Sequence, residues 1–131
     1  MRIRIVSIPV EDQDKALEFY TTKLNFVKRK DIPVGEGNRW LTLVSQEEQD
    51  GPEILLEPSV KNFEPSKVYQ LALFEAGLPY TQFDVSDVQK EYDRLINHGV
   101  DFSVKPTEMG TVKIAVFDDT CGNHIQLVEV L

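Results

Sequence analysis

Residues 10–20 read VEDQDKALEFY, and this stretch decides the fold. It follows IRIVSIPV, an apolar segment whose alternation predicts a strand over residues 3–10. Asp12 stands where a helix N-cap is expected, and Asn25 can adopt the left-handed conformation that ends a helix. Between them, apolar residues recur at helical spacing, namely Ala16, Leu17, Phe19, Tyr20 and Leu24. The stretch therefore predicts a strand that leads directly into an amphipathic helix.

The same pattern returns at residues 85–95, VSDVQKEYDRL, after the strand-like segment YTQFD. Ser86 and Gln89 fit a capping box, and Gly99 suits the end of the helix. The apolar stripe of this second helix comprises Val88, Tyr92, Leu95 and Ile96. Identical residues occur at Val10 and Val85, at Asp12 and Asp87, and at Lys15 and Lys90. The chain is therefore predicted to contain one structural unit twice.

Each predicted helix is followed by three predicted strands. In the first unit they occupy residues 26–32, 39–45 and 53–57, separated by the turns PVGEGN and QEEQDGP. In the second unit they are FSVK, VKIAVF and HIQLVEV, with TCGN as the turn before the last strand. A helix is predicted between the units, over about residues 64–77. The sequence thus predicts one α+β domain, residues 1–131, with βαβββ modules at about 1–58 and 80–131.

The charge balance of the chain limits its partners. Twenty-two acidic residues oppose 14 basic ones, a net charge of −8 that argues against nucleic acid and anionic lipid. No stretch approaches the ~20 apolar residues of a membrane span, and MRIRIV lacks the apolar core of a signal peptide. The single cysteine, Cys121, cannot form an internal disulfide. We therefore expect a cytoplasmic protein.

The repeat resembles a known superfamily in two places. IPVEDQDKALEFY opens the first unit and FDDTCGNHIQLVEV closes the second, as in the vicinal-oxygen-chelate superfamily of glyoxalases, bleomycin-resistance proteins and extradiol dioxygenases. The resemblance covers nearly the whole chain. It implies two half-barrel sheets around a cavity, with helices on the outer faces. It also implies that modules pair, either within one chain or across a homodimer, and we expect a homodimer.

Metal-binding members of this superfamily carry one ligand on the first strand and one on the last strand of each unit. The resemblance places these ligand positions at Ile5, Glu57, Tyr80 and Gln126. Ile has no donor atom, neutral Tyr is a poor ligand, and Gln offers one neutral oxygen. This set falls short of the three protein ligands of a catalytic zinc site. We therefore expect no cofactor; a divalent metal with ligands elsewhere is the alternative.

The resemblance also defines the residues expected to line the cavity. Glu57 is the best candidate for a catalytic group, as a general base or as the partner of a cationic ligand, although an exposed strand carboxylate is equally compatible with its position. Tyr80 and Trp40 can stack on a ligand or simply fill space. His124 can act as a base or sit at a rim, and the role of Cys121 is open. The predicted ligand-binding residues are Ile5, Ser7, Trp40, Leu55, Glu57, Tyr80, Gln82, His124 and Gln126.

Three functions are compatible with this reading. The first is a metal-free protein that binds or sequesters a small molecule, similar to the bleomycin-resistance branch. The second is a metal-dependent enzyme similar to lactoylglutathione lyase. The third is a non-catalytic regulatory or assembly module. The sequence predicts the first and does not identify the ligand or establish catalysis.

Overall fold

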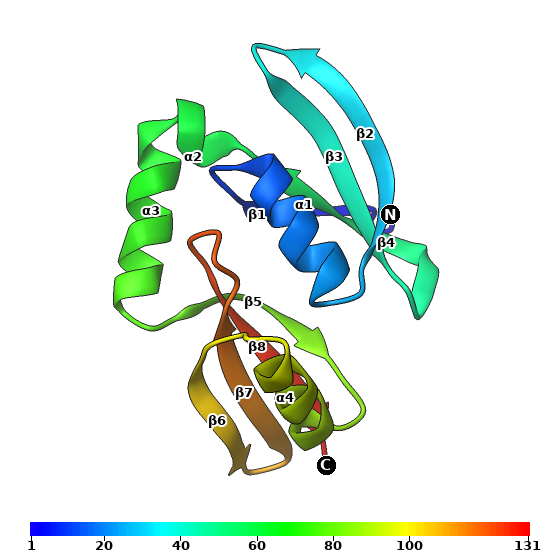
Figure 1. The fold of residues 1–131 in the computed structure, drawn as a ribbon, viewed down its shortest axis with the longest axis vertical. Helices are drawn as coiled ribbons and strands as arrows, with labels where there is room; N and C mark the ends of the chain where they lie inside the picture. The colour runs from blue at the N-terminus through cyan, green and yellow to red at the C-terminus, as the bar shows by residue number, and fades with distance from the viewer. The chain divides into compact units, whose positions relative to one another are not determined.

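The computed structural model describes all residues, 1–131, and each half of the chain has the predicted βαβββ order (Figure 1). The first half comprises β1 (Ile5–Pro9), α1 (Gln13–Thr22), β2 (Val27–Gly35), β3 (Asn38–Ser45) and β4 (Glu48–Glu57). Two helices follow, α2 (Ser59–Asn62) and α3 (Glu64–Glu75). The second half comprises β5 (Pro79–Asp84), α4 (Val88–Asn97), β6 (Phe102–Met109), β7 (Val112–Asp118) and β8 (His124–Val130). No helix is long and apolar enough to cross a membrane.

The chain divides into two compact units, Met1–Tyr69 and Gln70–Leu131, with the boundary inside α3. Each unit holds a four-stranded mixed sheet, in the order β1-β4-β3-β2 in the first and β5-β8-β7-β6 in the second. The first strand of each sheet pairs in parallel with the last, and the remaining pairs are antiparallel. The two sheets therefore repeat one topology, and neither closes into a barrel.

In the first unit, α1 covers one face of its sheet (Figure 1). The side chain of Arg39 on β3 reaches Asp14 of α1, so Arg39 and the residues that alternate with it face the helix. Gln13 is buried because its amide donates to the carbonyls of Leu56 (2.9 Å) and Arg39 (2.7 Å) and accepts from the Arg39 N–H. The apolar core under α1 contains Ile8, Ala16, Phe19, Tyr20, Leu41, Leu43, Ile54 and Leu56.

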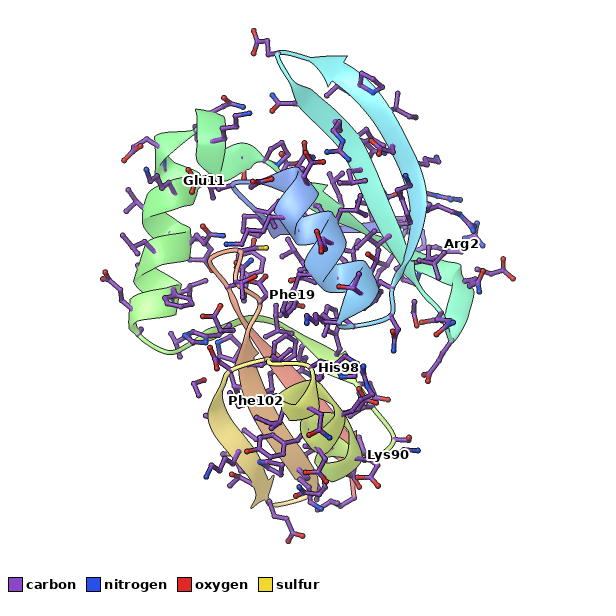
Figure 2. All side chains as sticks on the ribbon, in the orientation of Figure 1. Arg2, Glu11, Phe19, Lys90, His98 and Phe102 are labelled. Carbon is purple, nitrogen blue, oxygen red and sulfur yellow. The ribbon has the colours of Figure 1, made fainter.

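In the second unit, α4 lies against the equivalent face. The rings of Tyr92 and Phe102 meet edge to face at 4.7 Å, and Phe102 contacts Phe117 at 5.6 Å. Phe102 is labelled beside α4 in Figure 2. The backbone N–H of Val88 donates to Glu129 on β8, which fixes the start of the helix over the sheet. This core contains Val88, Leu95, Val100, Ala115, Phe117, Ile125 and Leu127.

Several features of the predicted helix ends are confirmed. Asp12 caps α1 by accepting from the Lys15 N–H (3.1 Å), and Asn25 has a φ of 62°. The predicted capping box of Ser86 and Gln89 is wrong. Asp87 is the N-cap of α4 and accepts from the Lys90 N–H at 3.0 Å, because the helix begins one residue later than the motif requires.

Strand boundaries differ more from prediction. The turn predicted over residues 46–52 is mostly strand, since β4 begins at Glu48 and pairs it with Ser45. The turn predicted over residues 33–38 shrinks to Glu36 and Gly37, which both have positive φ as a two-residue hairpin loop requires. Backbone pairing needs no apolar side chains, so composition alone missed both extensions. The first strand is also shorter than predicted, and α2 was not predicted.

Candidate functional site

The candidate site in the first unit is the sheet face that α1 leaves uncovered. Trp40 and Thr42 alternate with Arg39 and Leu41 along β3, so they project from the face opposite the helix. Cross-strand pairing extends this face in both directions, since Thr42 pairs with Leu55 and Leu55 pairs with Ser7. The first-unit face, as we call it, comprises Ile5, Ser7, Ile32, Trp40, Thr42, Val44, Glu53, Leu55 and Glu57.

The structure brings together all five residues predicted to line the first half of the site. Ile5, Ser7, Trp40, Leu55 and Glu57 lie on the first-unit face. Trp40 is 39% exposed and pairs across strands with exposed Ile32, which together make an apolar, solvent-facing strip. Leu55 is buried, Ser7 is exposed, and Ile5 and Glu57 are half-buried. The face therefore offers aromatic and aliphatic contact area with polar groups beside it.

One pair on this face was not predicted as a site. Glu53 is only 6% exposed, although it is a carboxylate, and Thr42 beside it is fully buried. The Thr42 hydroxyl donates to the carboxylate of Glu53 at 2.6 Å, a length typical of a hydrogen bond to a charged oxygen. Alternation along the predicted strand EILLE places Glu53 on one face with Leu55 and Glu57, although Glu53 was not among the predicted ligand-binding residues.

The strand pairing in the two sheets changes which residue of β4 corresponds to Gln126 of β8. Gln126 pairs with Gln82 on β5 and Val116 on β7, just as Leu55 pairs with Ser7 on β1 and Thr42 on β3. Leu55 is thus the counterpart of Gln126. Glu57 instead accepts from the Val10 N–H through its backbone carbonyl, and Val128 does the same for Val85. The assignment of Glu57 as the closing-strand counterpart of Gln126 is therefore wrong by two residues.

The second unit exposes the equivalent face of its own sheet, opposite α4. Gln82 and Gln126 lie there as cross-strand partners, and the Gln126 amide donates to the Gln82 amide oxygen at 2.9 Å. Tyr80 lies at an irregularity in the β5 register between Pro79 and Thr81 and is half-buried. The structure thus joins the two glutamines directly.

His124 begins β8 on the same face as Gln126 and is half-buried. Its ring stacks on Phe74 of α3, with centroids 4.2 Å apart and an angle of 8° between the planes. The Nδ1 atom is buried without a hydrogen-bond partner. Cys121 lies in the preceding turn, where its N–H donates to Asp119 and its carbonyl accepts from Gln70. These contacts hold the backbone of Cys121 in the turn.

A polar hollow of about 340 Å³ lies at the start of α1, on the helix side of the first sheet. Its lining includes Asp14 and Arg39, and Arg39 contacts Asp14 and also binds Asp31 through two nitrogens (2.9 and 3.1 Å). The Arg39 guanidinium holds the pKa of Asp31 below its ordinary value, and these carboxylates raise the pKa of Arg39. Glu11, labelled in Figure 2, is also part of the lining. This cluster orders the hairpin and helix start rather than the first-unit face.

The donor atoms at the family's ligand positions do not suit a divalent metal. With the register correction these positions hold Ile5, Leu55, Tyr80 and Gln126. Two of the four side chains have no donor atom, one is a phenol, and Gln126 offers a single neutral amide oxygen. Nowhere do three or more His, Cys, Asp or Glu side chains gather closely enough to hold a metal ion.

The chain is built from two repeated βαβββ units. Each unit has a helix on one face of its sheet and a mixed polar and apolar surface on the other face. The chain belongs to the Glyoxalase/Bleomycin resistance protein/Dioxygenase superfamily, whose sequence profile matches residues 2–127. It is 57% identical over 129 residues to YurT, an uncharacterized protein of Bacillus subtilis (strain 168), covering 98% of this chain and 99% of YurT.

Solved structures agree with this membership. UcmS2 is 32% identical and superposes with a TM-score of 0.83, with 98% of each chain covered. TnmS3, an antibiotic binding protein from Streptomyces sp. CB03234, is 24% identical with a TM-score of 0.75, covering 100% of this chain and 97% of TnmS3. The second similarity is one of fold.

Proposed function

We propose that this protein binds or sequesters a small molecule on the first-unit face, without a metal. The observation that carries the proposal is the combination on one sheet face of exposed Trp40 and Ile32 with Thr42, Ser7 and a carboxylate. Small-molecule sites are mostly apolar, with a few polar groups that orient the ligand. The donor chemistry at the four family positions supports a ligand held by contacts rather than by metal coordination.

The comparisons suggest the class of ligand. TnmS3, which shares this fold, is an antibiotic binding protein. We propose by this likeness that the present chain also takes an antibiotic-like molecule with a flat apolar part. Trp40 and Ile32 supply a surface on which such a part can lie. The Gln82–Gln126 pair offers amide donors and acceptors on the second sheet.

Trp40 is the single tryptophan, so its fluorescence reports directly on this face. A panel of antibiotics that includes planar aromatic members is titrated against the protein while Trp40 emission and thermal stability are followed. A true ligand changes the emission to saturation, and at 100 times its Kd it stabilises the fold by ~2.7 kcal/mol. Thermal stabilisation by a true ligand should be weaker in the Trp40→Phe variant than in wild type. A compound that only quenches Trp40 by collision would show no such difference. A panel in which no compound changes emission or stability would contradict the proposal.

The resemblance also supports a cytoplasmic homodimer. Light scattering coupled to gel filtration distinguishes a particle of 15.0 kDa from one of about twice that mass. A monomer at all concentrations would remove the homodimer from the proposal and leave small-molecule binding to be judged on the titration alone.

A further inference from the structure

Glu53 is a buried carboxylate without a cationic partner in the chain. It is 6% exposed, and its hydrogen-bond donor is the Thr42 hydroxyl. The ion pairs of the first unit involve Arg39, Lys28, Asp14 and Asp31, and none reaches Glu53. A carboxylate removed from water loses much of its hydration, so it needs compensation beyond one neutral donor. Nothing in the fold supplies a charge for it.

The surroundings of Glu53 are apolar and belong to the first-unit face. It lies on β4, between β1 and β3, and pairs across strands with Ile5 on one side and Val44 on the other. Leu55 follows two residues later on the same face and is buried. The carboxylate is therefore a single charged group set among aliphatic side chains, where an incoming positive charge interacts more strongly than at an open surface.

Two arginines near this end of the sheet do not neutralise it. Arg2 and Arg4 line a hollow of about 340 Å³ together with Asp50. The Arg4 carbonyl accepts the Glu53 N–H at 2.7 Å, but residue 4 alternates with Ile5, so its side chain points to the other side of the sheet. Arg2, labelled in Figure 2, precedes the strand and makes no ion pair with Glu53.

We propose that Glu53, oriented by Thr42, is the anchor for a positively charged nitrogen on the ligand. This inference rests on the proposed function, because it assigns a chemical group to a ligand of the first-unit face. The ligand class is an apolar or aromatic molecule that carries a protonated amine. Its apolar part contacts Ile5, the half-buried neighbour of Glu53 on β1, and its ammonium donates to the carboxylate. Glu53 thereby selects cationic over neutral and anionic molecules of the same shape.

The test uses three probes that share one phenyl ring and differ in charge: 2-phenylethylammonium, 2-phenylethanol and 3-phenylpropionate. Kd values are measured by titration calorimetry and Trp40 emission on the intact protein. The cation is expected to bind about tenfold tighter than the alcohol, which is the usual worth of a hydrogen bond to a charged group. The anion is expected to bind most weakly.

Variants identify which carboxylate is responsible. Glu53→Gln has nearly the same shape and can still accept from Thr42, so it should lower the cation-to-alcohol ratio to about one. Thr42→Val should reduce the ratio, and Thr42→Ser should restore it. Glu18→Gln, on the exposed surface of α1, should leave all three Kd values unchanged. If Glu53→Gln fails to fold, the Thr42 pair still tests the proposal.

Each outcome decides between the two proposals. Binding of all three probes with equal affinity would leave the binding face standing and overturn the role of Glu53. Loss of the charge preference in Glu57→Gln rather than in Glu53→Gln would overturn it as well, because Glu57 shares the face but is only half-buried. Binding of no probe would count against the first-unit face and with it against the anchor.

Discussion

Glu53 and His124 occupy equivalent positions in the two units, two residues before the paired strand positions Leu55 and Gln126. One position holds a buried carboxylate bonded to Thr42, and the other holds an imidazole stacked on Phe74. The repeated backbone therefore presents different chemistry on each sheet. The two units share the same residue where the helix begins, at the caps Asp12 and Asp87.

The core under α4 provides a direct test of helix orientation. Leu95 is fully buried, whereas its neighbour Ile96 is 43% exposed. Leu95→Ala should therefore lower the free energy of unfolding by ~2–5 kcal/mol. Ile96→Ala serves as the matched control and should cost below ~1 kcal/mol. Chemical denaturation measures both values, and equal losses would mean that the helix presents another face to the sheet.

The cap of the same helix can be tested one residue at a time. Asp87 accepts from the Lys90 N–H, so Asp87→Ala should cost ~1 kcal/mol of stability. Ser86→Ala should cost much less, because Ser86 precedes the cap. A larger loss from Ser86→Ala, measured by urea denaturation, would restore the capping box that the sequence predicted.

The ion-pair cluster at Arg39 should make the free energy of unfolding depend on pH in the acidic range. Arg39 holds the pKa of Asp31 below its ordinary value of 3.8, so this carboxylate binds protons more weakly in the folded state than in the unfolded state. Its contribution is complete above about pH 4 and is lost as the pH falls through the lowered folded pKa. Thermal unfolding from pH 7 to pH 2 should show a smaller acid-induced loss in Asp31→Asn than in wild type.

Asp101→Asn is the control for that acid experiment, because Asp101 is exposed and lies outside the cluster. Its unfolding profile should follow wild type. An Asp31→Asn profile parallel to wild type would show that the ion pair contributes nothing to stability, as is common for partly exposed pairs.

The turn before β8 should tolerate no side chain at Gly122. This residue has a φ of 99°, and a Cβ there would lie 2.8 Å from the side chain of Gln70. Gly110 also has positive φ, at 64°, but has open space around it. Gly110→Ala should cost ~1–2 kcal/mol from backbone strain alone. Gly122→Ala should cost more in denaturation, because it also disturbs the Gln70–Asn123 hydrogen bond; equal losses would mean that Gln70 moves aside freely.

Purified protein should contain far less than one equivalent of zinc, nickel, manganese or iron per chain. The reason is the donor set, in which Ile5 and Leu55 have no ligand atom and Gln126 offers only one neutral oxygen. Elemental analysis of protein prepared without chelators measures the content directly. About one ion per chain, retained after dialysis, would contradict the prediction and favour a lyase-like reaction.

The sequence by itself determined the repeat, the element types and the family resemblance. The periodicity of apolar residues indicates which face of a helix or strand is buried. Asp12 marks a helix start, and Asn25 and Gly99 mark helix ends, because few residue types suit those positions. Residues two apart on one strand share a face by geometry, so Leu55 and Glu57 were correctly predicted to lie together.

The tertiary structure decided which residues pair across strands and which side chains are buried by partners distant in sequence. Alternation does not say which residue of β4 lies beside which residue of β1, and the shift from Glu57 to Leu55 as the counterpart of Gln126 followed only from that pairing. Burial of Glu53 depends on Thr42, eleven residues away across a hairpin, and a sequence pattern carries no information about such desolvation. The local periodicity of the sequence therefore predicts the fold, whereas the chemistry of the site depends on cross-strand neighbours.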